Sequence, residues 1–381
     1  MNMCRRPRLV AARSRHAPEE PRDASQLPCS AGETPLAAPG LRLVRPLFRP
    51  VLVNGPFGDP GLYVDVLFEQ RALLFDLGDI AALEPRRVLR VSDVFVTHTH
   101  MDHFIGLDRL LRLSLGRDRP VRLYGPPGFI SQLEHKLAAY SWNLVANYAS
   151  DFTIHAHEVA ADGLLRRATF HCRERFTRRD DDPLAVRDGV LLDEAAFRVR
   201  CVLLDHQIPC LGLALEERTH VNVWKNRLAE FGVEPGPWLR DLKRAALSAA
   251  GDDTPIVARW VAGGARHERP LRLGDLRRRA LQMVAGEKIG YVTDVAGHAG
   301  NVARIVDLVG GADLLYIEST FLAADAAEAE RRYHLTARTA GDIGRRAGVK
   351  CVVPFHFSPR YAGREAELRA EVAAGFETSG G

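Results

Sequence analysis

Short runs of alternating or continuous hydrophobic positions cover most of the chain, which is the pattern of β-strands. In the first half of the chain they predict strands at 62–68, 72–75, 93–97 and 121–124. In the second half they predict strands at 200–205, 288–293, 313–317 and 350–355. Helical spacing of leucines over 107–115, and of small and apolar residues over 335–347 with Gly348 placed to end a helix, predicts helices between them. Strands that alternate with helices in this way predict an α/β protein.

Two stretches interrupt this pattern. Residues 151–200 are polar and rich in Arg and Asp, and we expect hairpins and loops there. Residues 217–285 contain a short predicted helix at 222–231, the Pro- and Gly-containing segment 234–237 and a charged stretch, so we expect an insertion or arm outside the core sheet. Residues 1–40 carry prolines and charges of both signs and predict a disordered leader, which leaves 41–381 as the folded domain.

Composition restricts the class of protein only broadly. The chain is 46% hydrophobic and 26% charged, as is usual for a globular protein, and no run approaches the roughly 20 apolar residues of a membrane span. The net charge of +4 is too small to indicate a nucleic-acid partner by itself. Six cysteines without any C-x-x-C spacing predict buried thiols in a reducing compartment, the cytoplasm.

Metal-binding side chains are concentrated directly after the predicted strand 93–97. His98, His100, Asp102 and His103 lie within one stretch of six residues. Side chains of extended backbone repeat every two residues, so His98 and His100 point the same way, while Asp102 and His103 turn to a second position. Imidazole and carboxylate groups suit Zn²⁺ or a similar ion. The cluster therefore predicts a metal site at the end of a strand.

This H-x-H-x-D-H spacing resembles the metallo-β-lactamase superfamily, which implies a four-layer αββα sandwich that holds one or two metals at its strand ends. Later segments resemble the ribonuclease Z branch in the same order along the chain: LDHQIPCLG at 204–212, KIGYVTD at 288–294, YIESTF at 316–321, HLTA at 334–337 and HFSPRY at 356–361. The loop NGPFG at 54–58 and the residues after Asp294 depart from that branch's usual text.

The resemblance implies a role for each matching residue. Seven residues become metal ligands in two sets: His98, His100 and His206 for one ion, Asp102, His103 and His356 for the other, and Asp294 shared between them. The implied cofactor is two Zn²⁺ per chain, with Mn²⁺ or another divalent ion as the alternative. Asp102 also takes a proton from water, and His334, oriented by Glu318, protonates the leaving 3′ oxygen. Asp76 is expected to orient a ligand imidazole without binding metal itself.

Basic residues supply the predicted contacts to substrate. Segment 232–243 is similar to a Gly-Pro-containing part of the arm, or exosite, with which ribonuclease Z grips tRNA. The candidate contacts are Lys225, Arg227, Arg240, Lys243, Arg244 and, beside the last ligand motif, Arg360. Contacts of such cations to phosphates do not depend on base sequence, which suits a protein that recognises the shape of tRNA. The alternative is a solvated, charged helical hairpin.

The resemblance implies a metal-dependent phosphodiesterase, an endoribonuclease that processes the 3′ end of tRNA precursors. An alternative keeps the fold but acts on small phosphodiesters or cyclic nucleotides, because the loop 54–58 and the surroundings of Asp294 are altered. A catalytically inactive RNA-binding homologue would show gaps in the ligand set, and a glyoxalase-type thioesterase would lack His334 and the 356–361 motif. A homodimer is kept open as the assembly.

Overall fold

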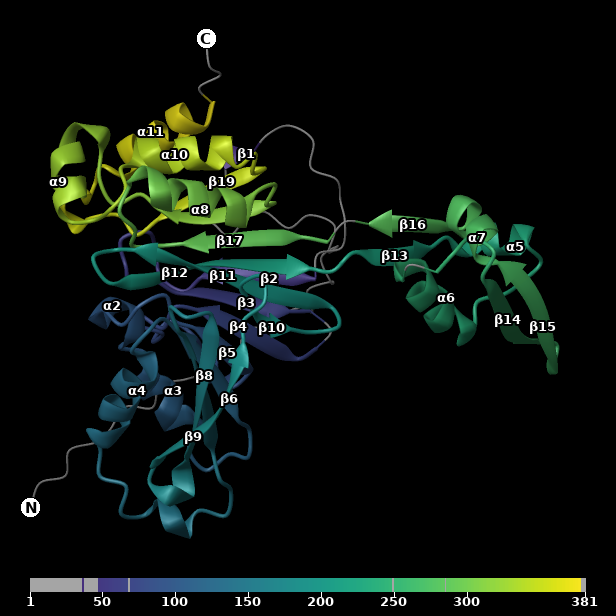
Figure 1. Ribbon diagram of the computed structural model, residues 1–381, viewed down its shortest axis with the longest axis horizontal. Coiled ribbons are helices and arrows are strands. Elements are labelled where there is room, and N and C mark those ends of the chain that lie inside the picture. Colours follow the sequence, from purple (N-terminus) through teal and green to yellow (C-terminus); the bar gives the residue numbers. More distant parts are fainter. Residues whose placement is uncertain (1–35, 38–46, 68, 249, 285, 378–381) are drawn as a thin grey trace, which may run out of the picture. The chain divides into compact units, whose positions relative to one another are not determined.

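The computed structural model describes residues 36–37, 47–67, 69–248, 250–284 and 286–377 (Figure 1). The predicted leader 1–40 lies outside these residues except for Leu36–Ala37, which form the short strand β1. None of the described helices is long and apolar enough to cross a membrane.

Two mixed sheets form the centre of the molecule. The first contains, in spatial order, β2 (Phe48–Leu52), β3 (Leu62–Val66), β4 (Arg71–Phe75), β5 (Val91–Phe95), β6 (Val121–Gly125), β7 (Thr153–Val159), β8 (Leu164–His171) and β9 (Arg178–Ala185). The second contains β1, β19 (Cys351–Phe355), β18 (Leu314–Glu318), β17 (Lys288–Val292), β12 (Pro209–Glu217), β11 (Phe197–Asp205) and β10 (Val190–Asp193). Strands β4 to β7 run parallel to one another, as do β17 to β19.

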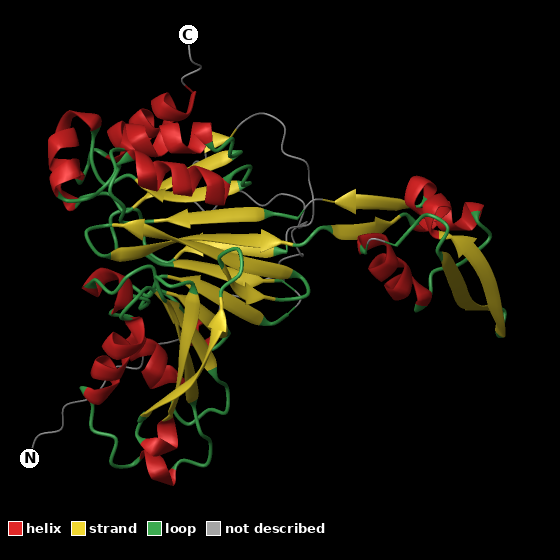
Figure 2. Ribbon diagram, in the orientation of Figure 1, coloured by secondary structure: helices red, strands yellow, loops and turns green. Residues whose placement is uncertain are grey.

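Three apolar clusters bind the layers together. Residues of both sheets, such as Phe95 and Tyr291, share the cluster between the sheets. The other face of the first sheet packs with α1 (Pro85–Val88), α3 (Leu107–Ser114) and α4 (Phe129–Ala138). The other face of the second sheet packs with α8 (Ala299–Val309), α10 (Ala337–Arg346) and α11 (Glu365–Glu377). Helices therefore cover both outer faces (Figure 2), and the predicted four-layer αββα sandwich is confirmed.

The predicted insertion folds around an apolar cluster of its own, which includes Leu228, Trp238 and Leu276. It leaves the second sheet after β12 and returns before β17 (Figure 1). Its elements are β13 (His220–Val223), α5 (Lys225–Glu230), α6 (Trp238–Leu247), β14 (Pro255–Ala262), β15 (Ala265–Arg272), α7 (Leu273–Arg279) and β16 (Leu281–Val284). Strand β13 pairs with β16, and β14 pairs with β15, in two separate two-stranded sheets. We call residues 220–284 the arm.

Most predicted elements lie within a few residues of their observed bounds. The hairpins expected over 151–200 are confirmed, because β7, β8 and β9 pair antiparallel in sequence, as do β10 and β11. The helix predicted at 222–231 is wrong at its start: residues 222–223 belong to β13 and the helix begins at Lys225. Tertiary pairing with β16 overrides the local helical pattern there.

Candidate metal centre

The first histidine motif is split into two groups by a change of backbone conformation. Strand β5 ends at Phe95, and His100 is still extended, with φ −60° and ψ 155°. Helix α2 (Met101–Phe104) begins directly afterwards, which turns Asp102 and His103 away from His98 and His100. The change from extended to helical backbone therefore directs these four candidate ligands to two neighbouring positions.

Two glycines let this short helix lie close to the backbone that follows β4. A Cβ on Gly106 would overlap the carbonyl oxygen of Gly78, and a Cβ on Gly78 would overlap the carbonyl oxygen of Asp102. The backbone N–H of Leu77 donates to the carbonyl of His103 at 2.9 Å, and that of Gly106 donates to the carbonyl of Leu77 at 2.9 Å. The absence of side chains at these two positions thus determines where Asp102 and His103 lie.

The remaining predicted ligands follow strands of the second sheet. His206 follows β11, Asp294 lies two residues after β17, and His356 follows β19. Asp294 and His356 have φ values of +36° and +57°, which residues with a side chain seldom adopt. Strained backbone of this kind concentrates at functional sites, where the surrounding structure enforces it.

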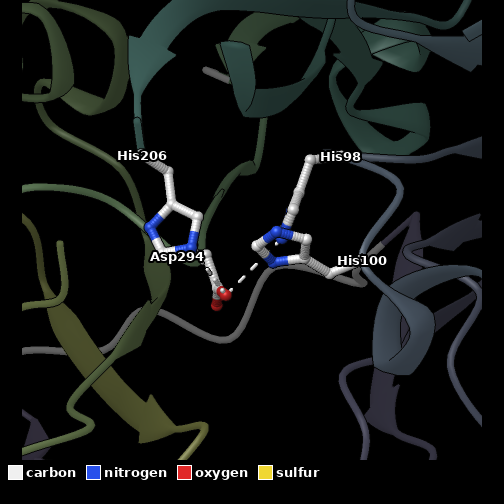
Figure 3. Close-up of side chains that lie close together, drawn as sticks. All are labelled: His98, His100, His206 and Asp294. Atoms are coloured by element: carbon white, nitrogen blue, oxygen red, sulfur yellow. Dashed lines mark ion pairs between the residues drawn. The ribbon is translucent and has the colours of Figure 1, made fainter. Parts of the chain in front are cut away.

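The structure brings the predicted ligands together in the two predicted sets. One set is His98, His100, His206 and Asp294, whose donor atoms all lie within 4.8 Å of one another (Figure 3). The second set is Asp102, His103 and His356, whose donor atoms also lie within 4.8 Å of one another. The four candidates of the histidine motif, residues 98–103, follow β5 of the first sheet. The other three follow strands of the second sheet, so the centre lies where the ends of both sheets meet.

Asp294 faces both sets at once. Its Oδ2 lies 3.6 Å from Nε2 of His98 and 3.5 Å from Nε2 of His206. Its Oδ1 lies 3.5 Å from Nε2 of His103 and 3.3 Å from Nε2 of His356. Ligands of a tetrahedral ion at about 2.0–2.2 Å are separated from one another by roughly 3.3–3.6 Å. The observed separations therefore fit two cations that share this carboxylate.

Three of the candidate donor nitrogens are free to bind cations. Nε2 of His98 and Nε2 of His103 are buried and have no hydrogen-bond partner among the described residues. Nδ1 of His206 lies 2.8 Å from the carbonyl oxygen of Tyr333, which can only accept, so the proton is on Nδ1 and the lone pair is on Nε2. Buried, unsatisfied nitrogens of this kind are rare in folded proteins, and a divalent metal ion satisfies them.

Asp76 is fully buried and contacts the ring of His103, one of the predicted ligands. Its Oδ2 lies 2.9 Å from Nδ1 of His103, which directs Nε2 of that ring toward the centre. The Tyr291 hydroxyl donates to Oδ2 at 3.0 Å, and the Thr97 backbone N–H donates to Oδ1 at 2.7 Å. Sequence reasoning missed Tyr291 and Thr97, although each lies within three residues of a predicted ligand.

The charge state of the centre follows from burial and from the surrounding side chains. Burial and the neighbouring His103 lower the pKa of His98 to about 2, so this imidazole is neutral near pH 7, as a metal ligand must be. Burial alone would raise the pKa of Asp102, but the hydrogen bond to His356 and the charge of His103 lower it to about 2. Histidine charges also hold the pKa of Asp294 well below its ordinary value despite its burial.

A third group contains Asp294, Glu318 and His334. Glu318 is fully buried; its Oε2 lies 3.0 Å from Nδ1 of His334, and its Oε1 accepts a hydrogen bond from the Val295 backbone at 2.7 Å. Burial by itself would lower the pKa of His334, but the Glu318 carboxylate has the larger effect in total, and the pKa is raised to about 9. His334 therefore carries a proton at neutral pH beside the metal centre, which suits a proton donor.

The predicted substrate contacts fall into two places. Lys225 and Arg227 are on α5, and Arg240, Lys243 and Arg244 are on α6, all within the arm. Two of them already have partners, because the Arg227 guanidinium lies 4.0 Å from the centroid of the Trp224 ring and Arg244 is 3.5 Å from Asp241.

Arg360, the remaining candidate, lies outside the arm, in the short 3-10 helix Pro359–Tyr361 that follows His356 along the chain. It donates to Glu328 at 3.3 Å and lies 5.0 Å from the centroid of Phe321, whose ring is 6.0 Å from that of His334. Arg360 therefore packs against Phe321, a neighbour of His334, and its guanidinium is paired with Glu328.

Comparison with known proteins gives a consistent set of relatives. The chain is 34% identical to ribonuclease Z of Deinococcus radiodurans over 308 residues. This alignment covers 80% of this chain and 87% of that protein. It is 28% identical over 320 residues to ribonuclease Z of Anoxybacillus flavithermus, covering 81% and 84%. The solved structure of human tRNase Z, short form, aligns with a TM-score of 0.45 at 19% identity over 82% of this chain and 92% of that one. No family model matches the chain.

Proposed function

The chain belongs to the ribonuclease Z family, and we propose that it is a metal-dependent endoribonuclease that processes the 3′ end of tRNA precursors. The observation that carries the proposal is Asp294, whose two oxygens face two complete sets of ligand atoms. Two cations that share a carboxylate suit displacement at a phosphodiester, where attacking and leaving oxygens both carry charge. We propose zinc as the ion, with two per chain held by the seven ligands named above.

We propose a separate chemical role for each residue of the site. Divalent cations, when bound, neutralise the phosphodiester oxygens and make hydroxide available near neutral pH. Asp102, whose side chain is 45% exposed, is the carboxylate placed to accept a proton from water. His334 holds a proton through Glu318 and is placed to deliver it to the leaving 3′ oxygen. Arg360, which packs against Phe321 and lies four residues after His356 in the chain, is proposed to contact a phosphate.

The arm supports the choice of a large substrate. Arg240, Lys243 and Arg244 lie three and four residues apart on α6 and therefore share one exposed face of that helix. Such a row of cations suits a ribose-phosphate backbone, and a small phosphodiester would not require it.

The decisive experiment compares substrates. Purified protein loaded with zinc is incubated with a 3′-extended pre-tRNA and, in parallel, with bis(p-nitrophenyl) phosphate and cyclic AMP. We expect endonucleolytic cleavage of the pre-tRNA near its 3′ end. Cleavage of the small esters alone would indicate the alternative enzyme that acts on small phosphodiesters. A homodimer stays a prediction, which the molecular mass in solution tests.

A further inference from the structure

The loops that carry His206 and Asp294 are joined by a single buried amide. Asn301, in the first turn of α8, has a fully buried side chain. Its Nδ2 donates to the carbonyl oxygen of Asp205 at 2.8 Å and to that of Ala296 at 2.9 Å. Its Oδ1 accepts from the backbone N–H of Asp205 at 3.1 Å. The side chain therefore both donates to and accepts from the backbone of Asp205, and it also donates to the backbone of Ala296.

These contacts lie directly beside two proposed ligands. Asp205 is the residue before His206, and Ala296 is two residues after Asp294. The Ala296 backbone N–H also donates to the carbonyl of Asp205 at 2.9 Å, so the two loops touch at the point that Asn301 covers. A movement of either loop would break hydrogen bonds of a buried amide, which costs free energy because no water replaces them.

His298 forms an outer part of the same arrangement. Its Nδ1 accepts from the Asn301 backbone N–H at 3.2 Å, so Nε2 carries the ring proton. That Nε2 lies 3.3 Å from Oδ2 of Asp205, and both side chains are about half exposed. His298 thus caps the start of α8 and connects that helix to the loop of His206.

We propose that Asn301 is a positioning residue of the metal centre, which holds His206 and Asp294 at the separation that one cation requires, with His298 as a secondary support. The inference rests on the proposed metal binding. Groups behind the ligands typically change metal affinity by about 10–100-fold when they are removed. Asn301 would act on two ligands from different elements, which distinguishes it from Asp76, whose contact is with the His103 ring.

The test measures zinc binding by competition with a chelator in Asn301→Ala, Asn301→Asp and the wild type. We expect zinc to bind about 10–100-fold more weakly in both variants, because neither retains the Nδ2 donor. Asn301→Asp keeps the shape of the side chain, so it serves if Asn301→Ala does not fold. His298→Ala removes only the outer contacts, and we expect a smaller loss of affinity.

Val302→Ala is the matched control. Val302 neighbours Asn301 on α8 and is buried in the apolar cluster on the outer face of the second sheet, so its truncation lowers stability without removing a side-chain hydrogen bond to either ligand loop. We expect wild-type zinc affinity in this variant, and in the cobalt-substituted protein we expect a shift of the visible absorption bands for Asn301→Asp but not for Val302→Ala. Wild-type zinc affinity and unchanged bands in the Asn301 variants would overturn the positioning role alone. Failure of the wild type to bind zinc would overturn the proposed metalloenzyme as well.

Discussion

At the scale of single residues, the site depends on side chains that direct other side chains. Asp76 and Glu318 are both fully buried carboxylates, and each lies within 3.0 Å of Nδ1 of an imidazole, so each determines the face that its histidine presents. The two pairs differ in what lies on the other side of the ring. Nε2 of His103 faces Asp294 and Asp102, which suits a ligand, whereas His334 lies beside the centre, which suits a proton donor.

The first prediction separates these roles. Replacing His334 with Ala should lower kcat for pre-tRNA by roughly 10²–10⁴-fold, because a positioned proton donor is removed. Zinc content should stay at the wild-type level, since the proposed ligand sets do not include this ring. Glu318→Gln should show a smaller reduction of kcat. Loss of zinc from the His334→Ala protein would mean that His334 is a ligand.

The second prediction concerns the glycine that admits helix α2. Gly106→Ala places a methyl group against the carbonyl oxygen of Gly78, so α2 must move together with Asp102 and His103. We expect a loss of stability of about 1–3 kcal/mol, as is usual for overpacking, and weaker zinc binding. Urea unfolding and zinc competition measure the two effects. Gly55→Ala is the control, because a Cβ there would meet no heavy atom within 4 Å, and it should leave both unchanged.

At the scale of elements, the sequence predicted best the strands that deliver ligands. Alternating or continuous apolar runs made β3 to β6, β11 and β17 to β19 recognisable. The residues that follow β5, β11, β17 and β19 were assigned to two ligand sets by the family resemblance. The structure brings the same residues together, and their role as ligands stays a prediction. Helices α4, α8 and α11 were not predicted, although α8 carries Asn301. A buried amide in the first turn of a helix gives no periodic signal in the sequence. Its partner Asp205 is far away along the chain, and its partner Ala296 lies in a loop. Contacts of this kind become visible only in three dimensions.

The third prediction concerns the strand end from which the arm returns. Burial raises the pKa of Glu287, just before β17, to about 7, and the carboxylates of Asp313 and Glu217 raise it too. Because the folded protein holds this proton more tightly than the unfolded chain, the stability that the protonated group contributes is complete below about pH 4.5 and is lost as the pH rises through 7.

Glu287→Gln replaces the titrating carboxyl with a neutral amide, so the variant does not lose this stability as the pH rises. We expect the variant to be more stable than the wild type at pH 8 by about 1–3 kcal/mol, with a smaller difference at pH 5. Denaturant unfolding at the two pH values measures it, with Glu84→Gln, at an exposed carboxylate, as the control. An equal difference at both pH values would show that Glu287 does not titrate in this range.

At the scale of the whole molecule, the arm and the sandwich have separate apolar cores. The two points where the arm joins the sandwich are neighbours: Glu216 on β12 pairs with Lys288 on β17, and the Glu217 backbone N–H donates to the carbonyl of Glu287 at 2.8 Å. A short turn can therefore connect β12 directly to β17, as in a β-hairpin.

The fourth prediction uses this connection. Replacing residues 220–284 with a short Gly-rich turn should leave the fold, zinc binding and hydrolysis of bis(p-nitrophenyl) phosphate intact. Cleavage of pre-tRNA should require a much higher substrate concentration, because the cations on α5 and α6 are gone. The slope of log affinity against log salt should also become shallower, by about 0.7–0.9 for each phosphate that the protein no longer binds. Unchanged cleavage of pre-tRNA would refute the arm as a binding surface.

Substitution of Arg240, Lys243 and Arg244 with Ala in the full chain is the matched control for this replacement. It should reproduce the weaker binding of pre-tRNA without removing any element. An effect of the replacement that these substitutions do not reproduce would be due to other parts of the arm.

The proposed ligands are spread along the chain from His98 to His356, and they meet where the two sheets end. During synthesis, the first histidine cluster leaves the ribosome long before its counterparts. A nascent or truncated chain that ends before His356 has most of the ligand side chains, but its second set is incomplete. If these residues hold two cations, the centre is complete only once the last parallel strand of the second sheet, β19, has been made and paired. On the proposed ligand assignment, an incomplete translation product that lacks β19 and His356 would not cut RNA.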